Sequence, residues 1–306
     1  MRISRRDALV AGVGSFLMPS VALAKTKGTL RVAHLTDFHC QPELGAAKGT
    51  EMAMTHAMRE KPDLVLVGGD IIMDGVAQNE ARTELQWKLY RDRMNSIVNV
   101  PIYHTLGNHD VWGWNKAASG TTGSEDRWGK NWFLKEFGHA KTYRSFDQGA
   151  WHFVVLDTLL QTPDGYNGFL DAEQMDWLKT DLGRTKRPTL LISHIPLFSI
   201  TPLASAYDAK TGEWTVGGNV MTKNIDAIRE VFAANPHVKV ALSGHTHLLD
   251  RVDYNGVSYL CGGAVCGAWW KGSNGPFPPG YRLLDLNDDG TFGERYVPWG
   301  WTSGLS

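Results

Sequence analysis

Short apolar runs recur along this chain, and five of them lead into Asp, Asn or His residues. These runs and the polar residues after them are 30–36 before Asp37 and His39, 64–67 before Asp70, 102–105 before Asn108 and His109, 190–193 before His194, and 238–242 before His245 and His247. Leucine-rich or β-branched runs of this length are typical of strands. Polar residues just past the carboxyl ends of strands are where α/β folds place their sites. The pattern therefore predicts a sheet-based fold with a functional site at its strand ends.

Segments of helical composition follow the first two of these runs, at residues 48–60 and 80–96. Strands that alternate with helices favour an α/β fold with much parallel pairing. The elements expected in the last third are a hairpin at 252–260 around Asn255 and Gly256, a strand at 281–286 and a strand at 293–297. Because the chain has no internal repeat or long linker, residues 25–306 are expected to form a single domain, with irregular insertions at 111–132 and 198–220.

The N-terminus has the pattern of an export signal. Arg5 and Arg6 precede an apolar stretch at 8–21, and residues 22–24 read Ala-Leu-Ala, the A-x-A form of a cleavage site. A polar residue followed by two arginines is typical of a twin-arginine signal. Residues 1–24 are therefore expected to direct export through the twin-arginine translocase and to be removed, leaving a periplasmic or secreted protein with no stable membrane span. An uncleaved anchor or a buried helix is the alternative.

Charge and cysteine content exclude some classes of protein. The formal net charge is −1, and cleavage after residue 24 would remove three Arg and one Asp and change it to −3. An acidic mature chain is a poor partner for a nucleic-acid polymer, because such binding depends on phosphate contacts from Lys and Arg. Three cysteines are too few for a disulfide framework. Cys261 and Cys266 could pair, or all three, Cys40 included, are small buried hydrophobic residues.

The polar motifs are weak one at a time. Asp-x-His is often a turn with a surface histidine, and Gly-Asp after a strand is commonly only the start of a loop. The Gly-His-Thr-His sequence at 244–247 places two imidazoles where one turn can direct both at one centre. Together and in this order, the five motifs resemble the calcineurin-like metallophosphoesterase superfamily, in its bacterial exported phosphodiesterase or phosphatase branch. The resemblance runs from Asp37 to His247 and covers most of the mature chain.

This resemblance implies a four-layer αββα sandwich, an α/β fold with two mixed sheets face to face, helices outside and metals at the strand ends. It also implies a dinuclear centre of two divalent or trivalent metal ions. By matching motif, one ion would be held by Asp37, His39 and His247, the other by Asn108, His194 and His245, and Asp70 would bridge the two. Imidazole and carboxylate ligands suit iron, manganese or zinc, and a bridging carboxylate offsets the repulsion between the cations.

His109 is left without a metal by this comparison. In the superfamily the matching histidine lies near the substrate phosphate, where it stabilises charge or protonates the leaving oxygen, and imidazole titrates in a suitable range. Asp110, next in sequence, is expected to orient His109 or to stabilise its charge. The attacking group that the resemblance implies is a metal-bound hydroxide, which displaces the leaving group in line.

Tryptophans are concentrated after two of the motifs. Residues 111–132 contain four of the twelve Trp, and Trp269 and Trp270 follow the last histidine motif. Exposed indoles near a metal centre could stack on a base, a sugar or an apolar alcohol. Trp112 and Trp114 are the candidates for substrate contact. The alternative is that these indoles cover the core beneath long loops.

These observations favour metal-dependent hydrolysis of a small-molecule phosphate ester, with phosphodiesters of the cyclic-nucleotide or glycerophosphodiester type as the expected substrates. No Lys or Arg occurs at 37–43, 68–74 or 107–115, which suits a monoanionic diester better than a dianionic monoester. A periplasmic phosphomonoesterase is the first alternative, and a non-catalytic binding protein on the same fold is the second. Purple acid phosphatases are a weaker match, because no tyrosine stands at 71–74, just after the expected bridging Asp.

Overall fold

The computed structural model describes residues 28–163 and 165–304. The expected export signal, residues 1–24, lies outside this part of the chain. The strands are β1 (Thr29–Leu35), β2 (Leu64–Val67), β3 (Ile102–His104), β4 (Arg144–Gln148), β5 (Trp151–Val155), β6 (Leu159–Thr162), β7 (Gly165–Gly168), β8 (Thr189–Ile192), β9 (Tyr207–Asp208), β10 (Glu213–Trp214), β11 (Val238–Ser243), β12 (Leu249–Tyr254), β13 (Val257–Gly262), β14 (Gly280–Asn287) and β15 (Phe292–Pro298). The helices are α1 (Ala46–Arg59), α2 (Glu80–Ile97), α3 (Lys116–Ser119), α4 (Asn131–Phe137), α5 (Ala172–Arg184) and α6 (Ile225–Ala233), with short 3-10 helices η1 (Asn108–Asp110) and η2 (Thr201–Ser205).

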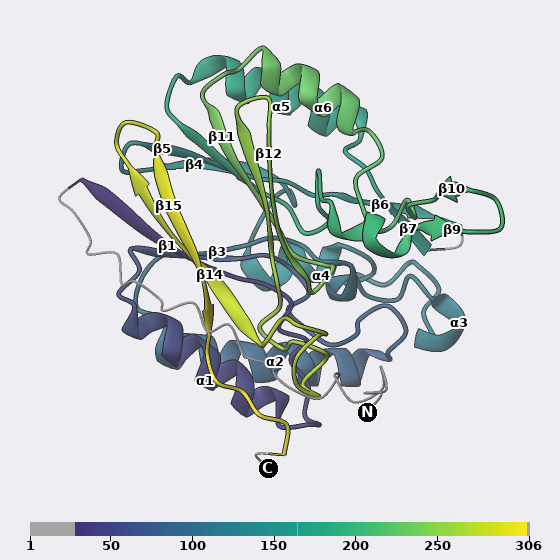
Figure 1. Cartoon of the computed structure of the whole chain (residues 1–306). Coiled ribbons are helices and arrows are strands. Elements are labelled where there is room, and N and C mark those ends of the chain that lie inside the picture. Colours follow the sequence, from purple (N-terminus) through teal and green to yellow (C-terminus); the bar gives the residue numbers. More distant parts are fainter. Residues whose placement is uncertain (1–27, 164, 305–306) are drawn as a thin grey trace, which may run out of the picture.

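Two mixed sheets lie face to face in the centre of the molecule (Figure 1). The first has the strand order β15-β14-β1-β2-β3, and the second has the order β12-β13-β11-β8-β5-β4. Buried apolar side chains from both sheets fill the space between them, among them Val32 and Leu66 of the first sheet and Phe153, Ile192 and Leu242 of the second. This packing confirms the expected sandwich of two mixed sheets.

Helices cover both outer faces of the sandwich (Figure 1). On the first sheet, Ala53 and Met54 of α1 pack in one cluster with Val65 of β2. On the second sheet, Leu178 of α5 and Phe232 of α6 pack in another cluster with residues of β11. The four layers are therefore helix, sheet, sheet and helix, as the sequence resemblance implied.

Local sequence explains several of these elements. All four residues of β2 are buried, because Leu64 and Leu66 face the second sheet while Val65 faces the outer helices. Asn79 directly precedes α2 as its N-cap residue, and Asp171 directly precedes α5 in the same way. Each side chain accepts a hydrogen bond from a backbone amide of the first turn, at 2.9 and 2.8 Å. Such N-caps satisfy donors that the helix itself cannot.

Parallel pairing brings the predicted site motifs to one edge of the sandwich. Strands β1, β2 and β3 are parallel to one another in the first sheet, and so are β5, β8, β11 and β13 in the second. The carboxyl ends of parallel strands lie at the same edge of a sheet. The two expected insertions are also present: residues 111–132 carry α3, and residues 198–220 carry η2 and the β9-β10 hairpin, which projects beside β6 and β7 in Figure 1.

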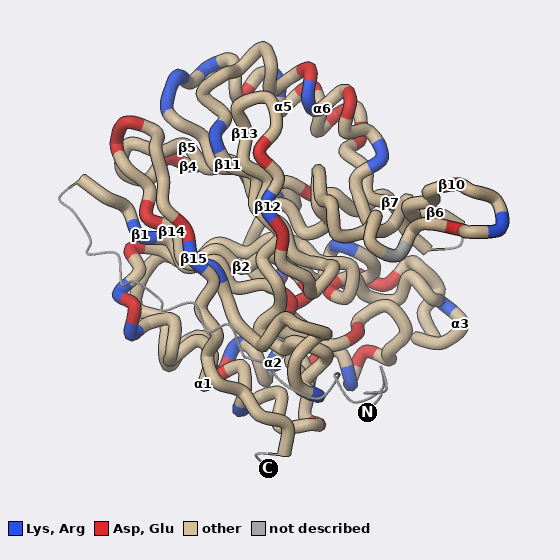
Figure 2. The backbone as a smooth tube through the Cα atoms, in the orientation of Figure 1, with Lys and Arg blue, Asp and Glu red and all other residues tan. Residues whose placement is uncertain are grey.

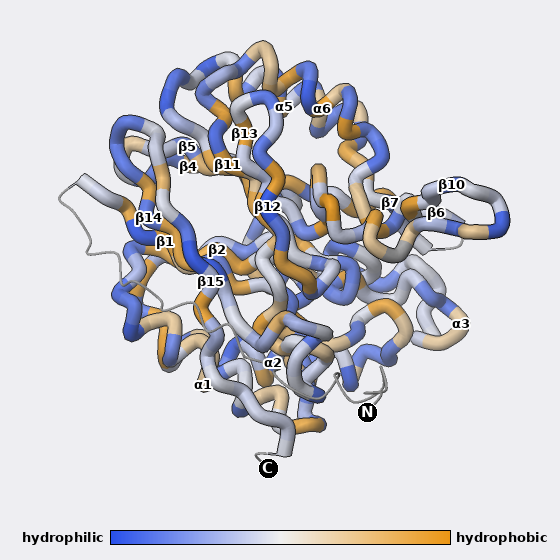
Figure 3. Tube along the Cα trace, in the orientation of Figure 1, coloured by the Kyte–Doolittle hydropathy of each residue, from blue (hydrophilic) through white to orange (hydrophobic). Residues whose placement is uncertain are grey.

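Charged residues of both signs are mixed along the chain, as the near-neutral net charge suggests. In Figure 2, Lys and Arg positions are interspersed with Asp and Glu positions along the backbone tube. Hydrophobic segments lie mainly within the sandwich, whereas many outer loops and helix turns are hydrophilic (Figure 3). Within residues 28–163 and 165–304, no helix has the length and apolar character needed to span a bilayer.

Candidate metal centre

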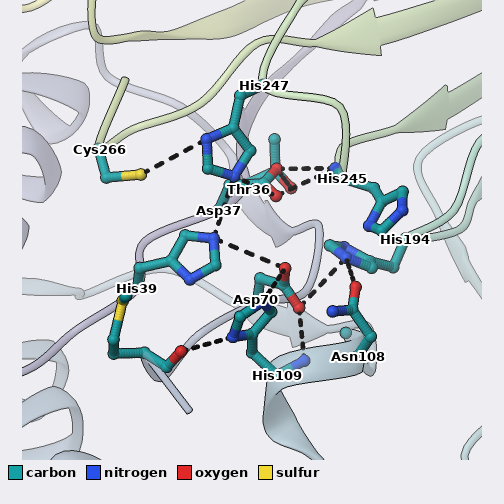
Figure 4. Close-up of polar contacts among 12 residues, drawn as sticks. Thr36, Asp37, His39, Asp70, Asn108, His109, His194, His245, His247 and Cys266 are labelled. Carbon is teal, nitrogen blue, oxygen red and sulfur yellow. Dashed lines mark hydrogen bonds and ion pairs between the residues drawn. The ribbon is translucent and has the colours of Figure 1, made fainter. Parts of the chain in front are cut away.

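The loops after β1, β2, β3, β8 and β11 bring all the predicted ligands to one place (Figure 4). These ligands are Asp37, His39, Asp70, Asn108, His194, His245 and His247. Three overlapping sets have ligand atoms within 4.8 Å of one another, namely Asp70 with His194 and His245, Asp70 with His39 and His109, and His39 with His247 and Cys266. Asp70 belongs to two of these sets. In Figure 4 its carboxylate lies between His39 and His194, as a bridging carboxylate would.

Around His194, three electron-rich atoms face one another. The ring donates from Nδ1 to the Gly68 carbonyl oxygen at 2.8 Å, which leaves Nε2 with a lone pair in the neutral imidazole. That Nε2 lies 3.0 Å from Oδ1 of Asn108 and 3.2 Å from Oδ1 of Asp70. Three acceptors at this range repel one another unless a positive charge lies among them. A ring held through a backbone carbonyl is also the usual arrangement of a metal-binding histidine.

His247 has the same arrangement. Its Nδ1 donates to the Gly267 carbonyl oxygen at 2.7 Å, and its Nε2 lies 3.0 Å from Nε2 of His39 and 3.2 Å from Oδ1 of Asp37. Asp37 is itself fixed by the hydroxyl of Thr36, which donates to Oδ2 at 2.6 Å. The chemistry and spacing of these donors fit a metal ion.

His245 is oriented by a residue that the sequence did not single out. Its Nε2 donates to the carbonyl oxygen of Asn219 at 2.8 Å, and its buried Nδ1 has no hydrogen-bond partner. Nδ1 is therefore the ring atom available to a cation. Asn219 belongs to the insertion at 198–220, so that insertion contributes directly to the centre.

The backbone of the site is held in a costly conformation. Five predicted ligands have left-handed φ angles, namely Asp37 (57°), His39 (44°), Asp70 (48°), His245 (72°) and His247 (57°). The left-handed conformation costs a non-glycine residue roughly 1–2 kcal/mol. Backbone strain of this kind is concentrated at functional sites. The loops hold one another in place, because the Asp37 amide donates to the Gly69 carbonyl oxygen and the His39 amide to that of Asp70, at 3.0 and 2.9 Å.

Two glycines allow these loops to approach closely. A Cβ on Gly107 would lie 2.0 Å from the backbone nitrogen of Asp70. A Cβ on Gly244 would lie 2.0 Å from Oγ1 of Thr36 and 2.4 Å from Oδ2 of Asp37. The glycines of the Gly-Asn-His-Asp and Gly-His-Thr-His motifs therefore serve close packing of the ligand loops.

The electrostatics of the centre favour positive charge. Burial opposes ionisation of Asp37 and Asp70, but His247 and His194 respectively hold the pKa of each carboxyl below its usual range. Burial likewise opposes protonation of His194, yet the Asp70 carboxylate raises the pKa of this imidazole to about 9. The two buried carboxylates thus favour a cation beside His194, which a metal ion would supply in place of a proton.

His109 differs from the other site histidines in its surroundings. Its side chain is 31% exposed, and its Nε2 lies 4.0 Å from Oδ2 of Asp70. The ring is oriented by the Met73 carbonyl oxygen, which accepts from Nδ1 at 2.5 Å. Nε2 is therefore left as the atom that can exchange a proton at the opening of the site.

Asp110 does not orient His109 as expected. Its Oδ1 accepts from the amides of Ile71 and Ile72 at 2.8 and 3.1 Å, and its Oδ2 accepts from the amide of Gly107 at 2.9 Å. Burial and the nearby Asp70 raise the pKa of the Asp110 carboxyl to about 7. The side chain therefore joins the loops after β2 and β3, because buried backbone donors need acceptors. Asp110 thereby supports the loop that carries Asp70.

The expectation that Trp112 contacts substrate is wrong. Its side chain is buried, donates from Nε1 to the Gln78 carbonyl oxygen at 3.0 Å and packs edge-on against Trp132. Trp114 is partly buried and lines a cavity. The exposed indole at the centre is Trp269, 42% exposed, with its ring centroid 4.6 Å from that of His247. Sequence position alone could not separate the core indole from the exposed one.

Two further residues contact the centre, although the sequence pattern did not predict these contacts. Trp270 is buried and donates from Nε1 to the His39 carbonyl oxygen at 3.0 Å. Cys266 lies with its Sγ 3.9 Å from Nδ1 of His247. Cys40, Cys261 and Cys266 are all free and buried, so the alternative of small buried residues holds and the 261–266 pair does not form.

Comparisons with known proteins point the same way as this geometry. Residues 30–249 match the family model described as calcineurin-like phosphoesterase. The chain is 26% identical over 280 residues to the 3',5'-cyclic adenosine monophosphate phosphodiesterase CpdA of Pseudomonas aeruginosa, covering 87% of this chain and 88% of that protein.

Two solved structures share the fold. A dimetal phosphatase from Danio rerio superposes with a TM-score of 0.55 at 16% identity, covering 89% of this chain and 99% of that one. The purple acid phosphatase PPD1 of yellow lupin superposes with a TM-score of 0.60 at 14% identity, covering 90% of this chain and 52% of that one. At such low identity the likeness concerns the fold alone.

Proposed function

The chain belongs to the calcineurin-like phosphoesterase family, and we propose that it hydrolyses phosphodiesters of the cyclic-nucleotide type with the help of two bound metal ions. As a metallophosphoesterase it is a hydrolase of phosphate esters. The observation that carries the proposal is the shared carboxylate: Asp70 lies in ligand sets with both His39 and His194, and acceptor atoms face one another on either side of it.

In this proposal the seven candidate ligands divide into two groups of three, one for each ion, and one shared carboxylate. Asp37, His39 and His247 would hold one ion, Asn108, His194 and His245 the other, and Asp70 both. When bound, such ions activate water, clamp phosphate oxygens and offset the charge of the transition state. Iron, manganese and zinc all suit imidazole and carboxylate ligands.

The protein itself supplies orientation and a proton. The strained ligand loops fix the centre before substrate arrives, which limits reorganisation during the reaction. His109 is held through Nδ1 by Met73, so its Nε2 can donate a proton to the leaving oxygen or stabilise charge on the phosphate.

Preference for diesters has two supports. The relative from Pseudomonas aeruginosa is a cyclic nucleotide phosphodiesterase by name, and it is matched over most of its length. No Lys or Arg occurs in the ligand-bearing segments 37–43, 68–74 and 107–115. A phosphomonoester dianion would gain more from such cations than a diester monoanion does.

The direct test compares bis-p-nitrophenyl phosphate with p-nitrophenyl phosphate at matched pH and metal. We expect a higher kcat/KM for the diester, and loss of both activities on addition of a chelator. His194→Ala should abolish hydrolysis. His237→Ala is the matched control, because His237 precedes β11 at the opposite end of the strand from the ligands and should leave activity unchanged. A tenfold monoester preference would favour the phosphomonoesterase, and no hydrolysis of either ester would favour the binding protein.

We also propose export by the twin-arginine route, on the basis of Arg5, Arg6 and the apolar stretch that follows. This route carries folded proteins, which would allow metal binding before export. Replacing both arginines with Lys should keep the precursor in the cytoplasm. Normal periplasmic appearance in cells that lack the translocase would contradict the proposal.

A further inference from the structure

A cavity of about 560 Å³ lies beside the metal centre, in the size range of small-molecule sites. Its lining includes Val76, Trp114, Lys116, Gln161 and Tyr166. These residues come from the β6-β7 hairpin, the insertion at 111–132 and the loop after β2. None of them is among the predicted metal ligands.

The cavity is connected to the centre by two contacts. The ring of Tyr166 meets that of His245 edge-on, with centroids 6.3 Å apart. On the other side, the amide of Gly75 donates to the His109 carbonyl oxygen at 2.7 Å, and the next residue, Val76, lines the cavity. The cavity therefore adjoins His245 on one side and the loop that carries His109 on the other.

The walls of the cavity suit a flat ring. Trp114 packs against the core cluster, and its indole lies so close to Gly129 that a Cβ there would be 3.1 Å from Nε1. Tyr166 pairs across the hairpin with Gln161, so the phenol and the amide share a face of β6-β7. Aromatic faces stack on planar rings, and a side-chain amide can donate to and accept from a ring edge.

Lys116 adds a positive charge at the exposed rim of the cavity. Its Nζ lies 5.3 Å from the ring centroid of Trp128, which steadies the side chain. A polar or anionic group on a bound molecule would find a cationic partner at this rim.

We infer that this cavity binds the planar heterocycle of a nucleoside arm of the substrate, with Trp114 and Tyr166 as the stacking surface and Gln161 at the ring edge. The inference rests on the proposed phosphodiesterase function. To the cyclic-nucleotide specificity proposed above it adds the place where the base is bound and the residues that bind it.

The first test measures KM for bis-p-nitrophenyl phosphate and for methyl p-nitrophenyl phosphate, which share a leaving group. Trp114→Ala and Tyr166→Ala should raise KM for the bis-aryl ester about 5- to 100-fold and leave KM for the methyl ester nearly unchanged. Tyr166→Phe keeps the ring and should restore most of the affinity. Trp214→Ala is the matched control, because this exposed indole lies on the β9-β10 hairpin against Tyr207.

The second test separates this inference from the proposed function, because it needs no hydrolysis. Calorimetry of the metal-loaded full chain should detect binding of adenosine but not of ribose, and both alanine variants should lose adenosine binding while keeping their metal content. Equal KM increases for the two esters, or adenosine binding that survives both substitutions, would overturn the inference. Diester hydrolysis by the wild type would then still stand.

Discussion

At the scale of single residues, the metal centre is defined by what its ring nitrogens face. His194 and His247 each donate one N–H to a backbone carbonyl and turn the other nitrogen towards carboxylate or amide oxygens at 3.0–3.2 Å. His109 also donates to a carbonyl, but its second nitrogen lies 4.0 Å from Asp70 and its side chain is partly exposed. On these surroundings we propose a ligand role for His194 and His247 and a proton-donating role for His109.

Removal of the His109 ring should separate these roles. His109→Ala should lower kcat about 100- to 10,000-fold, the usual contribution of a positioned general acid, while metal content stays at the wild-type level. The loss should shrink along a series of diesters with increasingly acidic leaving groups, because a good leaving group needs no proton. An equal loss across the whole series would show that His109 binds phosphate without donating a proton.

At the scale of elements, helix α1 supports the metal centre through one indole. Gly49 lies in α1, and a Cβ there would be 2.1 Å from the ring of Trp270. Trp270 is fully buried and donates to the His39 carbonyl oxygen. The helix, the indole and the ligand loop therefore form one packed unit, in which a change on the helix reaches His39.

Gly49→Ala should therefore destabilise the protein even though alanine is the better helix former. We expect a loss of about 1–3 kcal/mol in unfolding free energy from overpacking, together with weaker metal binding. Gly183→Ala in α5 is the matched control, because nothing lies within 4 Å of its added Cβ. The unfolding free energy of Gly183→Ala should increase by about 0.5–1 kcal/mol. Urea unfolding of both variants measures these changes. The same change in unfolding free energy for both would contradict the packing of Trp270 against α1.

A second element-scale contact should make stability depend on pH. His152 on β5 donates to Asp147 on β4 at 2.7 Å and to Asp181 on α5 at 2.9 Å. Burial lowers the pKa of His152, but the hydrogen bonds to Asp181 and Asp147 outweigh it and raise the pKa above its ordinary value. The protonated ring therefore stabilises the fold. This contribution is fully present below the unfolded-state pKa of about 6.5 and is lost as pH rises through the folded-state pKa.

The measurement is the difference in unfolding free energy between the wild type and His152→Asn as a function of pH. This difference should be largest near pH 5.5 and should decrease towards pH 9. Contributions from other titrating groups cancel because both proteins share them. A difference that stays constant or grows with pH would contradict the assigned charge state of His152.

At the scale of the whole molecule, the sequence predicted the parts of the fold in which local pattern and tertiary burial agree. The run at 64–67 coincides with β2 because that strand is buried on both faces. The Asn255-Gly256 turn was readable because its backbone requires positive φ at both positions. No helix was assigned to α5 or α6, although Asp171 marks the start of α5 and Leu178 and Leu182 supply its buried face.

That the candidate ligands would converge was predictable for a physical reason that does not extend to the rest of the site. Short polar motifs after parallel strands share one edge of their sheet, and the face-to-face packing of the two sheets brings the two edges together. Whether an indole is buried depends instead on partners far away in the sequence. Trp112 is covered by Trp132 and bonded to Gln78, whereas Trp269 lies in a turn with left-handed backbone and stays exposed. The contact between Asn219 and His245 likewise depends on the path of a long insertion.

The central claim is a pair of metal ions that share Asp70, and metal content measured alongside diester hydrolysis tests it most directly. Elemental analysis of active wild-type protein should give about two metal equivalents per chain. Asp70→Ala should lose most of both ions and all activity, Asn108→Ala should chiefly lose one ion, and Asp181→Ala, remote from the centre, should keep both. Full activity with less than one equivalent, or two equivalents retained in Asp70→Ala, would contradict the account.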